Sequence, residues 1–248
     1  MDKKLTKEYN PLLNSQDWDI LIVLDACRYD TFNAVMNRPG ALSPRESFSS
    51  CTGEWLQSVR DQDLSHITYI SANPLISSYR IKPNETNVKF KHFIDAWDIG
   101  WDDKLKSIHP DTVTKLAVDY LKKNPGTKLV VHYIQPHHPF IGKTKIKELG
   151  YEQIRLREKG EDISNKVFEK LTIYQQVQDG TITYDHCMQA YRDNLKLALD
   201  SLDPLLEMPG KKIITADHGD CFGEDGVYAH PAGNKHPLLV TVPWFEVF

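Results

Sequence analysis

The strongest constraint on the fold is an unbroken run of five aliphatic residues at positions 20–24, which ends abruptly at Asp25. A strand with one face in solvent alternates apolar and polar residues, whereas a strand buried on both faces is apolar throughout. Burial on both faces is typical of inner strands in a parallel sheet that helices cover on each side. The run therefore predicts an inner strand with an aspartate at its carboxyl end.

Further apolar runs alternate along the chain with segments of helical periodicity. The predicted strands cover residues 20–24, 67–70, 129–134, 213–214 and 238–242. The predicted helices cover residues 29–36, 54–59, 112–121 and 185–206. Strands that alternate with helices predict an α/β fold, a three-layer sandwich with a mostly parallel central sheet flanked by helices. Because the chain has no internal repeat and no Gly/Ser linker, we expect a single domain over residues 1–248.

One segment, residues 143–178, differs from the rest of the chain. It is rich in charged residues and lacks the apolar runs of the predicted strands. We expect it to form a helical or looped insertion at the rim of the domain rather than a second core. From the rim it could cover a site as a lid.

The charge balance and the apolar runs narrow the classes of function. The chain has 30 basic and 34 acidic residues and a net charge of −4, so it lacks an overall positive field that would attract nucleic acid. Its apolar runs are far shorter than the roughly 20 residues of a membrane-spanning helix. The first residues lack the apolar segment of a secretory signal, and the four cysteines form no CxxC pair. We therefore expect a cytoplasmic protein with no membrane span and no nucleic-acid partner.

Two of the predicted strands end in acidic residues. Asp25 follows the first strand, and Asp217 and His218 follow a strand near the end of the chain. In an open parallel sheet such ends meet at one edge, where ligands bind. Carboxylate oxygens with an imidazole nitrogen suit zinc or manganese, so the pattern predicts a divalent metal site. Taken singly, Asp25 is equally compatible with a helix cap, and Asp217 with the start of a turn at Gly219.

A hydroxyl-rich stretch and two histidine-containing loops supply further polar groups. Cys51 and Thr52 precede a predicted helix, where backbone N–H groups favour an anion and a nucleophile could lie. A residue that simply caps this helix is the structural alternative. The four loop histidines are His137, His138, His230 and His236. For His236, packing beside the proline that follows it is an equally good interpretation.

The order of these motifs resembles the alkaline phosphatase superfamily, in particular its sulfatase-like branch of arylsulfatases, lipoteichoic acid synthases and phosphoethanolamine transferases. The likeness spans residues 18–246, and its most specific parts are Thr-Ala-Asp-His-Gly-Asp at 215–220 and Gly-Glu-Asp-Gly-Val-Tyr-Ala-His at 223–230. The transferases carry similar Ser-Asp-His-Gly-Glu and Gly-Glu-x-Gly-x-Tyr-x-His segments. The resemblance implies an alkaline-phosphatase-like catalytic domain.

The resemblance also implies roles for individual residues. It implies a metal site formed by Asp25, Thr52, Asp217 and His218. Thr52 matches the threonine that is both a metal ligand and the nucleophile that becomes phosphorylated, because coordination makes its alkoxide accessible near neutral pH. His137 and His230 match histidines that contact phosphoryl oxygens or assist the leaving group. His138, His236 and Cys51 are additional candidates.

Three departures from the family pattern narrow this interpretation. True sulfatases mature a cysteine within Cys-x-Pro-Ser-Arg, whereas Cys51 is followed by Thr-Gly-Glu-Trp. Members with two zinc ions use an Asp-x-x-x-His pair that this chain lacks, so we expect one ion. A second ion held by His137, His230 and His236 is the alternative. The family's transferases are anchored in membranes and act outside the cytoplasm, so their lipid substrates are not carried over.

The sequence therefore predicts a zinc- or manganese-dependent hydrolase or transferase that acts on a phosphoester through a phospho-threonine intermediate at Thr52. Its substrate would be a small-molecule or glycan-linked phosphoester. A first alternative is a sulfatase, a sulfuric-ester hydrolase that uses a matured Cys51. A second alternative is a catalytically silent relative that binds an anionic glycan or a protein through the insertion.

Overall fold

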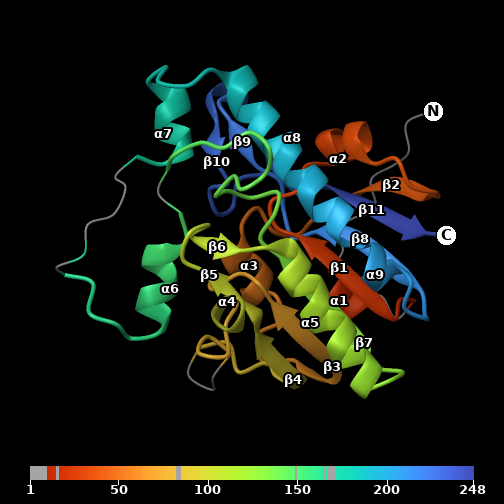
Figure 1. Ribbon diagram of the computed structural model, residues 1–248. Helices are drawn as coiled ribbons and strands as arrows, with labels where there is room; N and C mark the ends of the chain where they lie inside the picture. Colours follow the sequence, from red (N-terminus) through yellow and green to blue (C-terminus); the bar gives the residue numbers. More distant parts are fainter. Residues whose placement is uncertain (1–9, 15–16, 82–84, 149, 165, 167–170) are drawn as a thin grey trace.

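A seven-stranded sheet runs through the centre of the computed structural model, which describes residues 10–14, 17–81, 85–148, 150–164, 166 and 171–248 (Figure 1). Its strands are β1 (Ile20–Leu24), β2 (Gly40–Glu46), β3 (Asp63–Ser71), β4 (Lys89–Asp95), β7 (Lys128–Tyr133), β8 (Lys212–Ala216) and β11 (Thr241–Val247). They lie in the order β2-β11-β8-β1-β7-β3-β4. Only β11 runs antiparallel to its neighbours within this sheet. The predicted mostly parallel sheet is therefore confirmed.

Helices and short strands surround this sheet. The helices are α1 (Pro11–Asn14), α2 (Tyr29–Val35), α3 (Thr52–Gln57), α4 (Ala96–Ile99), α5 (Pro110–Lys123), α6 (Glu152–Glu158), α7 (Ile173–Gln178), α8 (Tyr184–Ser201), α9 (Asp203–Leu206) and α10 (Pro237–Val240), with one 3-10 turn at Glu224–Gly226. Two short hairpins pair β5 (Trp101–Asp102) with β6 (Ser107–Ile108) and β9 (Cys221–Phe222) with β10 (Tyr228–Ala229). The parallel strands point toward the side that carries α6, α7, β9 and β10 (Figure 1).

The core has two layers, and β1 contributes to both. Ile20, Ile22 and Leu24 pack in one apolar cluster with side chains of α2, α5 and α8. Leu21 and Val23 pack in the other cluster, with α1 and α3. Successive strand residues point to opposite faces, so a strand covered on both sides must be apolar at every position. The unbroken run in the sequence therefore reflects its central place in a three-layer sandwich, as predicted.

The prediction of a strand over residues 238–242 was correct only for residues 241 and 242. Pro237–Val240 forms the short helix α10, and the strand begins at Thr241. Pro237 occupies the first turn and His236 caps the helix, where a proline has no N–H to lose. Leu239 and Val240 are apolar because they pack against Cys221 rather than because they lie in the sheet. An apolar run this short cannot distinguish a buried turn of helix from a strand.

Other predicted elements differ from the structure mainly at their ends. The helix expected over residues 185–206 is divided, because α8 ends at Ser201 and α9 begins at Asp203 with a proline in its first turn. Strands β2 and β4 were missed because they form the two edges of the sheet and are largely half-buried or exposed. Edge strands need no continuous apolar run.

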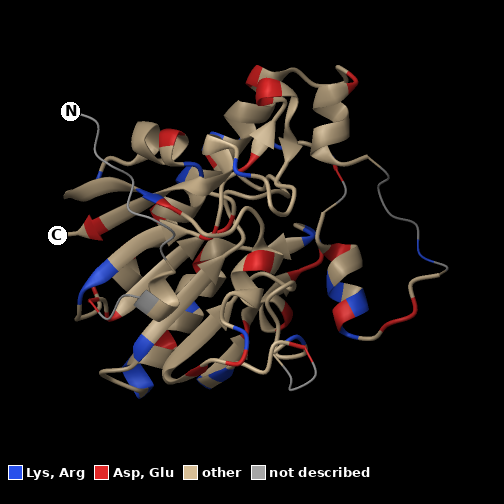
Figure 2. Cartoon of the chain, turned by 180° about the vertical axis from the view of Figure 1, so that it is seen from behind, with Lys and Arg blue, Asp and Glu red and all other residues tan. Residues whose placement is uncertain are grey.

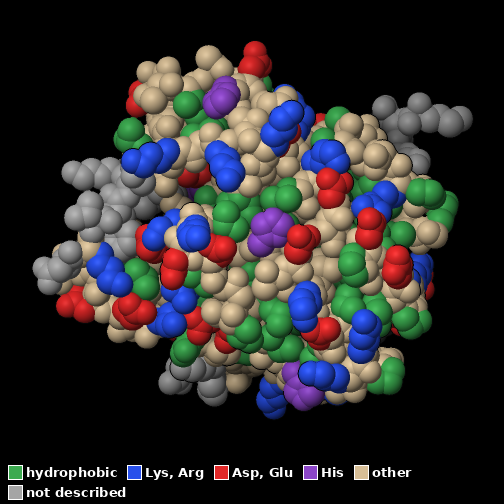
Figure 3. Space-filling model, viewed as in Figure 1, with side chains coloured by type: hydrophobic (Ala, Val, Ile, Leu, Met, Phe, Trp, Pro, Cys, Tyr) green, Lys and Arg blue, Asp and Glu red, His purple; other side chains and the backbone are tan. Residues whose placement is uncertain are grey.

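The insertion at residues 143–178 contains α6 and α7, and part of it, residues 149, 165 and 167–170, lies outside the described residues. Acidic and basic side chains are interspersed over the face of the molecule seen in Figure 3, in keeping with a net charge of −4. Within the described residues, no helix combines the length and apolar character that a membrane span requires. The division into a single domain over residues 1–248 stays a prediction.

Candidate active site

Two adjacent central strands bring the predicted acidic residues together. Asp25 follows β1 and Asp217 and His218 follow β8, which pairs in parallel with β1. The side chains of all three residues are fully buried. His218 Nε2 lies 3.6 Å from Asp25 Oδ1 and 3.4 Å from Asp217 Oδ2. The convergence follows directly from the parallel sheet, because both strands end at the same edge.

Thr52 joins this group from the start of α3. Its Oγ1 donates a hydrogen bond to Asp217 Oδ2 at 3.1 Å and lies 3.2 Å from His218 Nε2. Thr52 is not the residue that caps α3, because the N-cap position is Cys51. Asp25 does not cap α2 either, since that helix has Arg28 at its N-cap and no side-chain cap. The structure thus brings together all four residues of the predicted metal site, and the capping interpretations were wrong.

The electrostatics of this group favour a bound cation. Burial and the charge of Asp217 raise the pKa of the Asp25 carboxyl well above its ordinary value. Burial also raises the pKa of Asp217, but His218 and His132 outweigh it, so this pKa is lowered. Two neighbouring buried carboxylates repel each other unless a proton or a cation lies between them.

The hydrogen bonds around this group leave several of its atoms free to bind a cation. Asp25 Oδ1 is fully buried and accepts no hydrogen bond from the described residues. His218 Nδ1 donates to the carbonyl oxygen of Gly219 at 2.7 Å, so Nε2 carries the free lone pair. With the hydroxyl of Thr52 and Oδ2 of Asp217, these atoms form a donor set of oxygens and one nitrogen. Such a set fits zinc or manganese.

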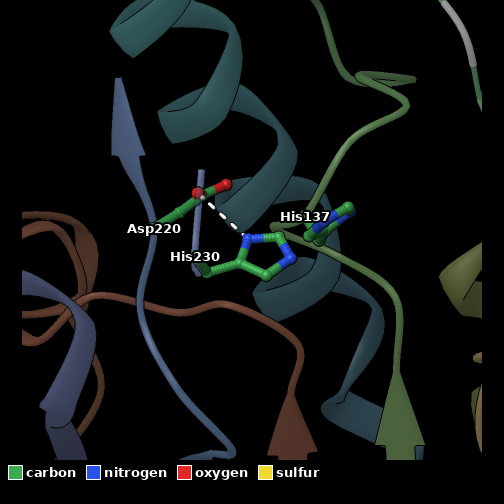
Figure 4. A group of neighbouring side chains, drawn as sticks. All are labelled: His137, Asp220 and His230. Atoms are coloured by element: carbon green, nitrogen blue, oxygen red, sulfur yellow. Dashed lines mark hydrogen bonds and ion pairs between the residues drawn. The ribbon is translucent and has the colours of Figure 1, made fainter. Parts of the chain in front are cut away.

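A second group of ligand atoms adjoins the first. His137, Asp220 and His230 each offer an atom within 4.8 Å of the others, and Figure 4 shows His230 between the other two. His230 Nδ1 lies 3.2 Å from Asp220 Oδ1. His137 Nδ1 donates to the carbonyl oxygen of His138 at 2.7 Å, which leaves its Nε2 free. The rings of His218 and His230 are 4.6 Å apart, so the two groups are neighbours.

Asp220 takes the place in this second group that the sequence predicted for His236. His236 instead caps α10, where its Nδ1 accepts from the N–H of Leu238 at 3.3 Å. Its Nε2 lies 3.1 Å from Asp225 Oδ2 at the surface. The structural interpretation of His236 is therefore the correct one, and we remove it from the candidate site.

A cavity of about 400 Å³ opens onto both groups of ligand atoms. Thr52, His137 and His230 line it from the sheet side, and Tyr151 and Tyr174 line it from the insertion. The two additional candidates Cys51 and His138 line it as well. The expected position of the insertion over the site is consistent with these contacts.

His138 and Cys51 differ in how they are held in this cavity. The His138 ring stacks on His137 with the centroids 4.1 Å apart, and its Nδ1 forms an ion pair with Glu148 Oε2 at 2.7 Å. Burial lowers the pKa of His138, but Glu148 outweighs it and the pKa is raised. Burial raises the pKa of the Cys51 thiol, so it stays protonated near neutral pH. Cys51 therefore lacks the thiolate character of a reactive cysteine.

Sequence reasoning missed His132, which lies within β7 and is fully buried. Trp55 Nε1 donates to the Tyr69 hydroxyl at 3.3 Å, and that hydroxyl forms a hydrogen bond of 2.7 Å with His132 Nδ1. His132 Nε2 has no hydrogen-bond partner among the described residues and lies 3.7 Å from Asp217 Oδ2. His132, Asp25 and Asp217 offer ligand atoms within 4.8 Å of one another, so His132 is a further candidate ligand. Burial lowers the pKa of His132 to about 4, so its ring is neutral. The signal in the sequence was an imidazole inside an otherwise apolar strand.

Asn73 was also missed, and it holds Asp25 from the end of β3. Its Nδ2 donates to Asp25 Oδ2 at 2.5 Å, and its side chain is fully buried. In the sequence, Asn73 and the proline that follows it are typical of an ordinary turn. Only the order of the strands in the sheet places this turn beside Asp25.

Comparisons of the sequence with protein-family models and with curated proteins found no match. Solved structures match the fold. Phosphoethanolamine transferase A from Neisseria meningitidis aligns with a TM-score of 0.54 and 13% identity, over 91% of this chain and 47% of that one. The periplasmic domain of phosphoethanolamine transferase EptC from Campylobacter jejuni aligns with a TM-score of 0.53 and 11% identity, over 92% and 77% of the two chains. The 2-O GAG sulfatase BT1596 aligns with a TM-score of 0.54 and 12% identity, over 94% and 64%.

The chain thus has the alkaline-phosphatase-type fold of phosphoethanolamine transferase and sulfatase domains, and the predicted resemblance is confirmed at this level. It spans about half the length of the transferase from Neisseria meningitidis. At 11–13% identity the likeness establishes the fold, whereas the activity has to be argued from the site.

Proposed function

We propose that this protein is a metal-dependent hydrolase or transferase that acts on a phosphoester through a phosphorylated Thr52. The observation that carries the proposal is the contact of the Thr52 hydroxyl with Asp217 and His218, next to the orphaned oxygen of Asp25. A hydroxyl at the wall of a cavity, beside buried carboxylates, is the arrangement that an activated nucleophile requires.

In the first step Thr52 Oγ1 attacks phosphorus, and the bond from phosphorus to the leaving-group oxygen breaks. The hydroxyl hydrogen of Thr52 is already directed at Asp217 Oδ2, which is the nearest acceptor for the proton. A divalent cation held by Asp25, Thr52, Asp217 and His218 would lower the pKa of the hydroxyl and neutralise charge on the phosphoryl group. In the second step, water or an acceptor alcohol attacks phosphorus and releases Thr52.

His137 and His230 would serve the phosphoryl oxygens and the leaving group. Each presents a ring to the cavity. Burial and the neighbouring histidines lower the pKa of His137, so its ring is neutral, and the hydrogen bond of Nδ1 to a carbonyl leaves Nε2 as an acceptor. Nε2 would accept the proton of the attacking water or alcohol in the second step. His230 is oriented by Asp220, as the bases of catalytic sites commonly are. We propose one zinc or manganese ion, and a second ion, where bound, would be held by His137, Asp220 and His230.

The substrate that we propose is a small-molecule or glycan-linked phosphoester. The cavity of about 400 Å³ accommodates a phosphoryl group with a modest organic substituent. Nucleic acid is a poor candidate because the net charge of the chain is −4. A cytoplasmic location stays a prediction, and fractionation of cells that carry the full-length chain tests it.

The proposal is tested by replacing the nucleophile. We expect Thr52→Ala to lower turnover of phosphomonoester and phosphodiester substrates by several orders of magnitude, with zinc or with manganese. Thr52→Ser, which keeps a hydroxyl, retains part of the activity and is the matched control. Mass spectrometry of the trapped wild-type enzyme should place a phosphate on the peptide that contains Thr52. Unchanged turnover of Thr52→Ala would remove Thr52 from the mechanism.

A sulfuric-ester hydrolase is the second candidate, because Cys51 lines the same cavity beside Thr52. This candidate requires that Cys51 be matured to formylglycine, which changes the mass of the residue. Intact-mass analysis of the purified protein decides between the two. A mass that corresponds to unmodified cysteine excludes the sulfatase route.

A further inference from the structure

The insertion reaches the two groups of ligand atoms with tyrosine hydroxyls: Tyr174 donates to Asp220 Oδ2 at 2.7 Å, and Tyr151 contacts Asp25. Tyr151 occupies the N-cap position of α6, and its side chain is buried. Its oxygen lies 3.4 Å from Asp25 Oδ2 and 3.2 Å from His137 Nδ1. Asp25 belongs to the central sheet, so this contact joins two parts of the chain that lie 126 residues apart.

The neighbouring hydrogen bonds fix the direction of the contact. His137 Nδ1 donates to the carbonyl oxygen of His138, so this nitrogen carries the proton and presents an N–H to Tyr151. The hydroxyl hydrogen of Tyr151 is therefore directed at Asp25 Oδ2, as the donor.

The two oxygens of Asp25 are used differently. Oδ2 accepts from Asn73 on the sheet side and from Tyr151 on the insertion side. Oδ1 accepts nothing from the described residues and lies 3.6 Å from His218 Nε2. Two donors on Oδ2 thus set the plane of the carboxylate and direct Oδ1 toward Asp217 and His218. Partners of this kind orient metal ligands.

The other contacts of α6 are apolar contacts and ion pairs: Leu156 is buried, and Ile154 packs against the edge of the core. Arg155 and Lys159 lie 3.3 and 3.0 Å from Asp98 Oδ1. Arg80 pairs with Glu158 at the end of the helix. All of these pairs are partly exposed, and exposed pairs hold an element weakly. The hydroxyl of Tyr151 adds a buried polar contact with Asp25 to these, and through it the state of Asp25 can affect the position of α6.

We propose that Tyr151 is a positioning residue that aligns Asp25 for the cation and thereby couples metal binding to the docking of α6 on the sheet edge. The inference rests on the proposed metal site. Coupling between two binding events is reciprocal. A docked α6 strengthens metal binding, and the bound metal in turn stabilises the docked helix.

The experiment compares the full-length wild type with Tyr151→Phe, which removes one oxygen and keeps the ring. The probe is Mn²⁺ or Zn²⁺ alone, and its affinity is measured by competition with a chromophoric chelator. We expect about a tenfold loss of affinity in Tyr151→Phe. Tyr184→Phe is the matched control, because its hydroxyl contacts Glu224 rather than the metal site, and it should bind like the wild type.

A second measurement follows the docking of α6 directly. Amide hydrogen exchange across residues 152–158 should slow when metal is added to the wild type, and this slowing should be lost in Tyr151→Phe. The coupling is overturned if Tyr151→Phe binds metal as tightly as the wild type. It is also overturned if amide exchange across residues 152–158 of the wild type is the same with and without metal. A wild type that binds no metal overturns both this inference and the proposed metal site. A third outcome would overturn the coupling and leave the proposed function standing. In it the wild type binds metal, Thr52→Ala loses turnover, and Tyr151→Phe binds metal as tightly as the wild type.

Discussion

The sheet edge and the insertion meet at the same cavity, but they are held in place in different ways. On the sheet edge, Asp25 and Asp217 follow adjacent strands, and their side chains are fully buried. In the insertion, α6 is attached through apolar contacts of Ile154 and Leu156 and through charged side chains of both signs, which Figure 2 shows on the helix. Asp98, which accepts two of these ion pairs, is 34% exposed. The proposed metal ligands thus lie on the more rigid sheet edge. The side of the cavity formed by the insertion lies on a part of the fold that we expect to open more easily.

Because the proposed metal ligands lie on the sheet edge, we expect the largest effect of metal on stability to depend on Asp25. We expect Asp25→Asn to abolish tight Mn²⁺ or Zn²⁺ binding, because it removes the charge of a ligand. At a metal concentration of a hundred times the Kd, wild-type protein gains about 2.7 kcal/mol in free energy of unfolding, and chelation removes this gain. Asp25→Asn should gain nothing. Thermal or urea unfolding with and without a chelator measures both quantities.

The metal-free comparison provides the control. The pKa of Asp25 is raised by burial and by Asp217, so its charge costs stability at neutral pH when no cation is bound. Below the ordinary pKa of 3.8 the carboxyl is protonated in both folded and unfolded chains, and the cost vanishes. Metal-free Asp25→Asn should therefore be at least as stable as metal-free wild type at pH 7. A large loss of stability there would show that Asp25 is structural.

The sheet edge could be predicted from the sequence because a parallel sheet leaves little freedom. Once 20–24 is an inner strand, Asp25 must lie at the edge where the other parallel strands end. The same holds for Asp217 and His218. Thr52 was harder, because its place depends on a loop, and the family pattern rather than the strand pattern identified it. The fold class followed from the alternation of apolar runs and helical segments.

The rest of the site depends on side chains that no local pattern marks. Asp220 and His236 both lie in the glycine-containing region that follows β8, and the path of that loop decides which of them reaches His230. Tyr151 reaches Asp25 only because α6 docks beside α4, through contacts distant in the sequence. A tertiary contact of this kind has no signal in composition or periodicity. The sequence therefore predicted the insertion as a segment that could cover a site or bind a partner, but not which of its residues contact the ligand atoms.

A smaller effect is expected beneath the sheet edge. Tyr69→Phe removes the hydroxyl that accepts from Trp55 Nε1 and is hydrogen-bonded to His132 Nδ1, so two buried polar atoms lose their partners. Leaving buried groups unpaired costs about 1–3 kcal/mol. We expect a loss of that size in the free energy of unfolding, measured by urea denaturation in the presence of chelator.

The matched variant for this prediction is Tyr120→Phe, whose hydroxyl contacts Thr68 and the exposed His92. Water can replace its hydrogen bonds, so its cost should be smaller. Equal losses in both variants would contradict the view that Tyr69, His132 and Asp217 form a buried, water-free support for the metal site. Equal stability of Tyr69→Phe and wild type would contradict it as well.

The smallest effect is expected at the attachment of the insertion. Asp98→Asn removes the charge that pairs with Arg155 and Lys159 and should change the free energy of global unfolding by less than about 1 kcal/mol. Local opening of α6 should nevertheless become more frequent, and amide exchange across residues 152–158 should accelerate. Because salt screens exposed pairs, the difference from wild type should shrink between low salt and 1 M salt. A decrease in global stability of several kcal/mol would show instead that the insertion is an integral part of the core, and the contrast between the two regions would fail.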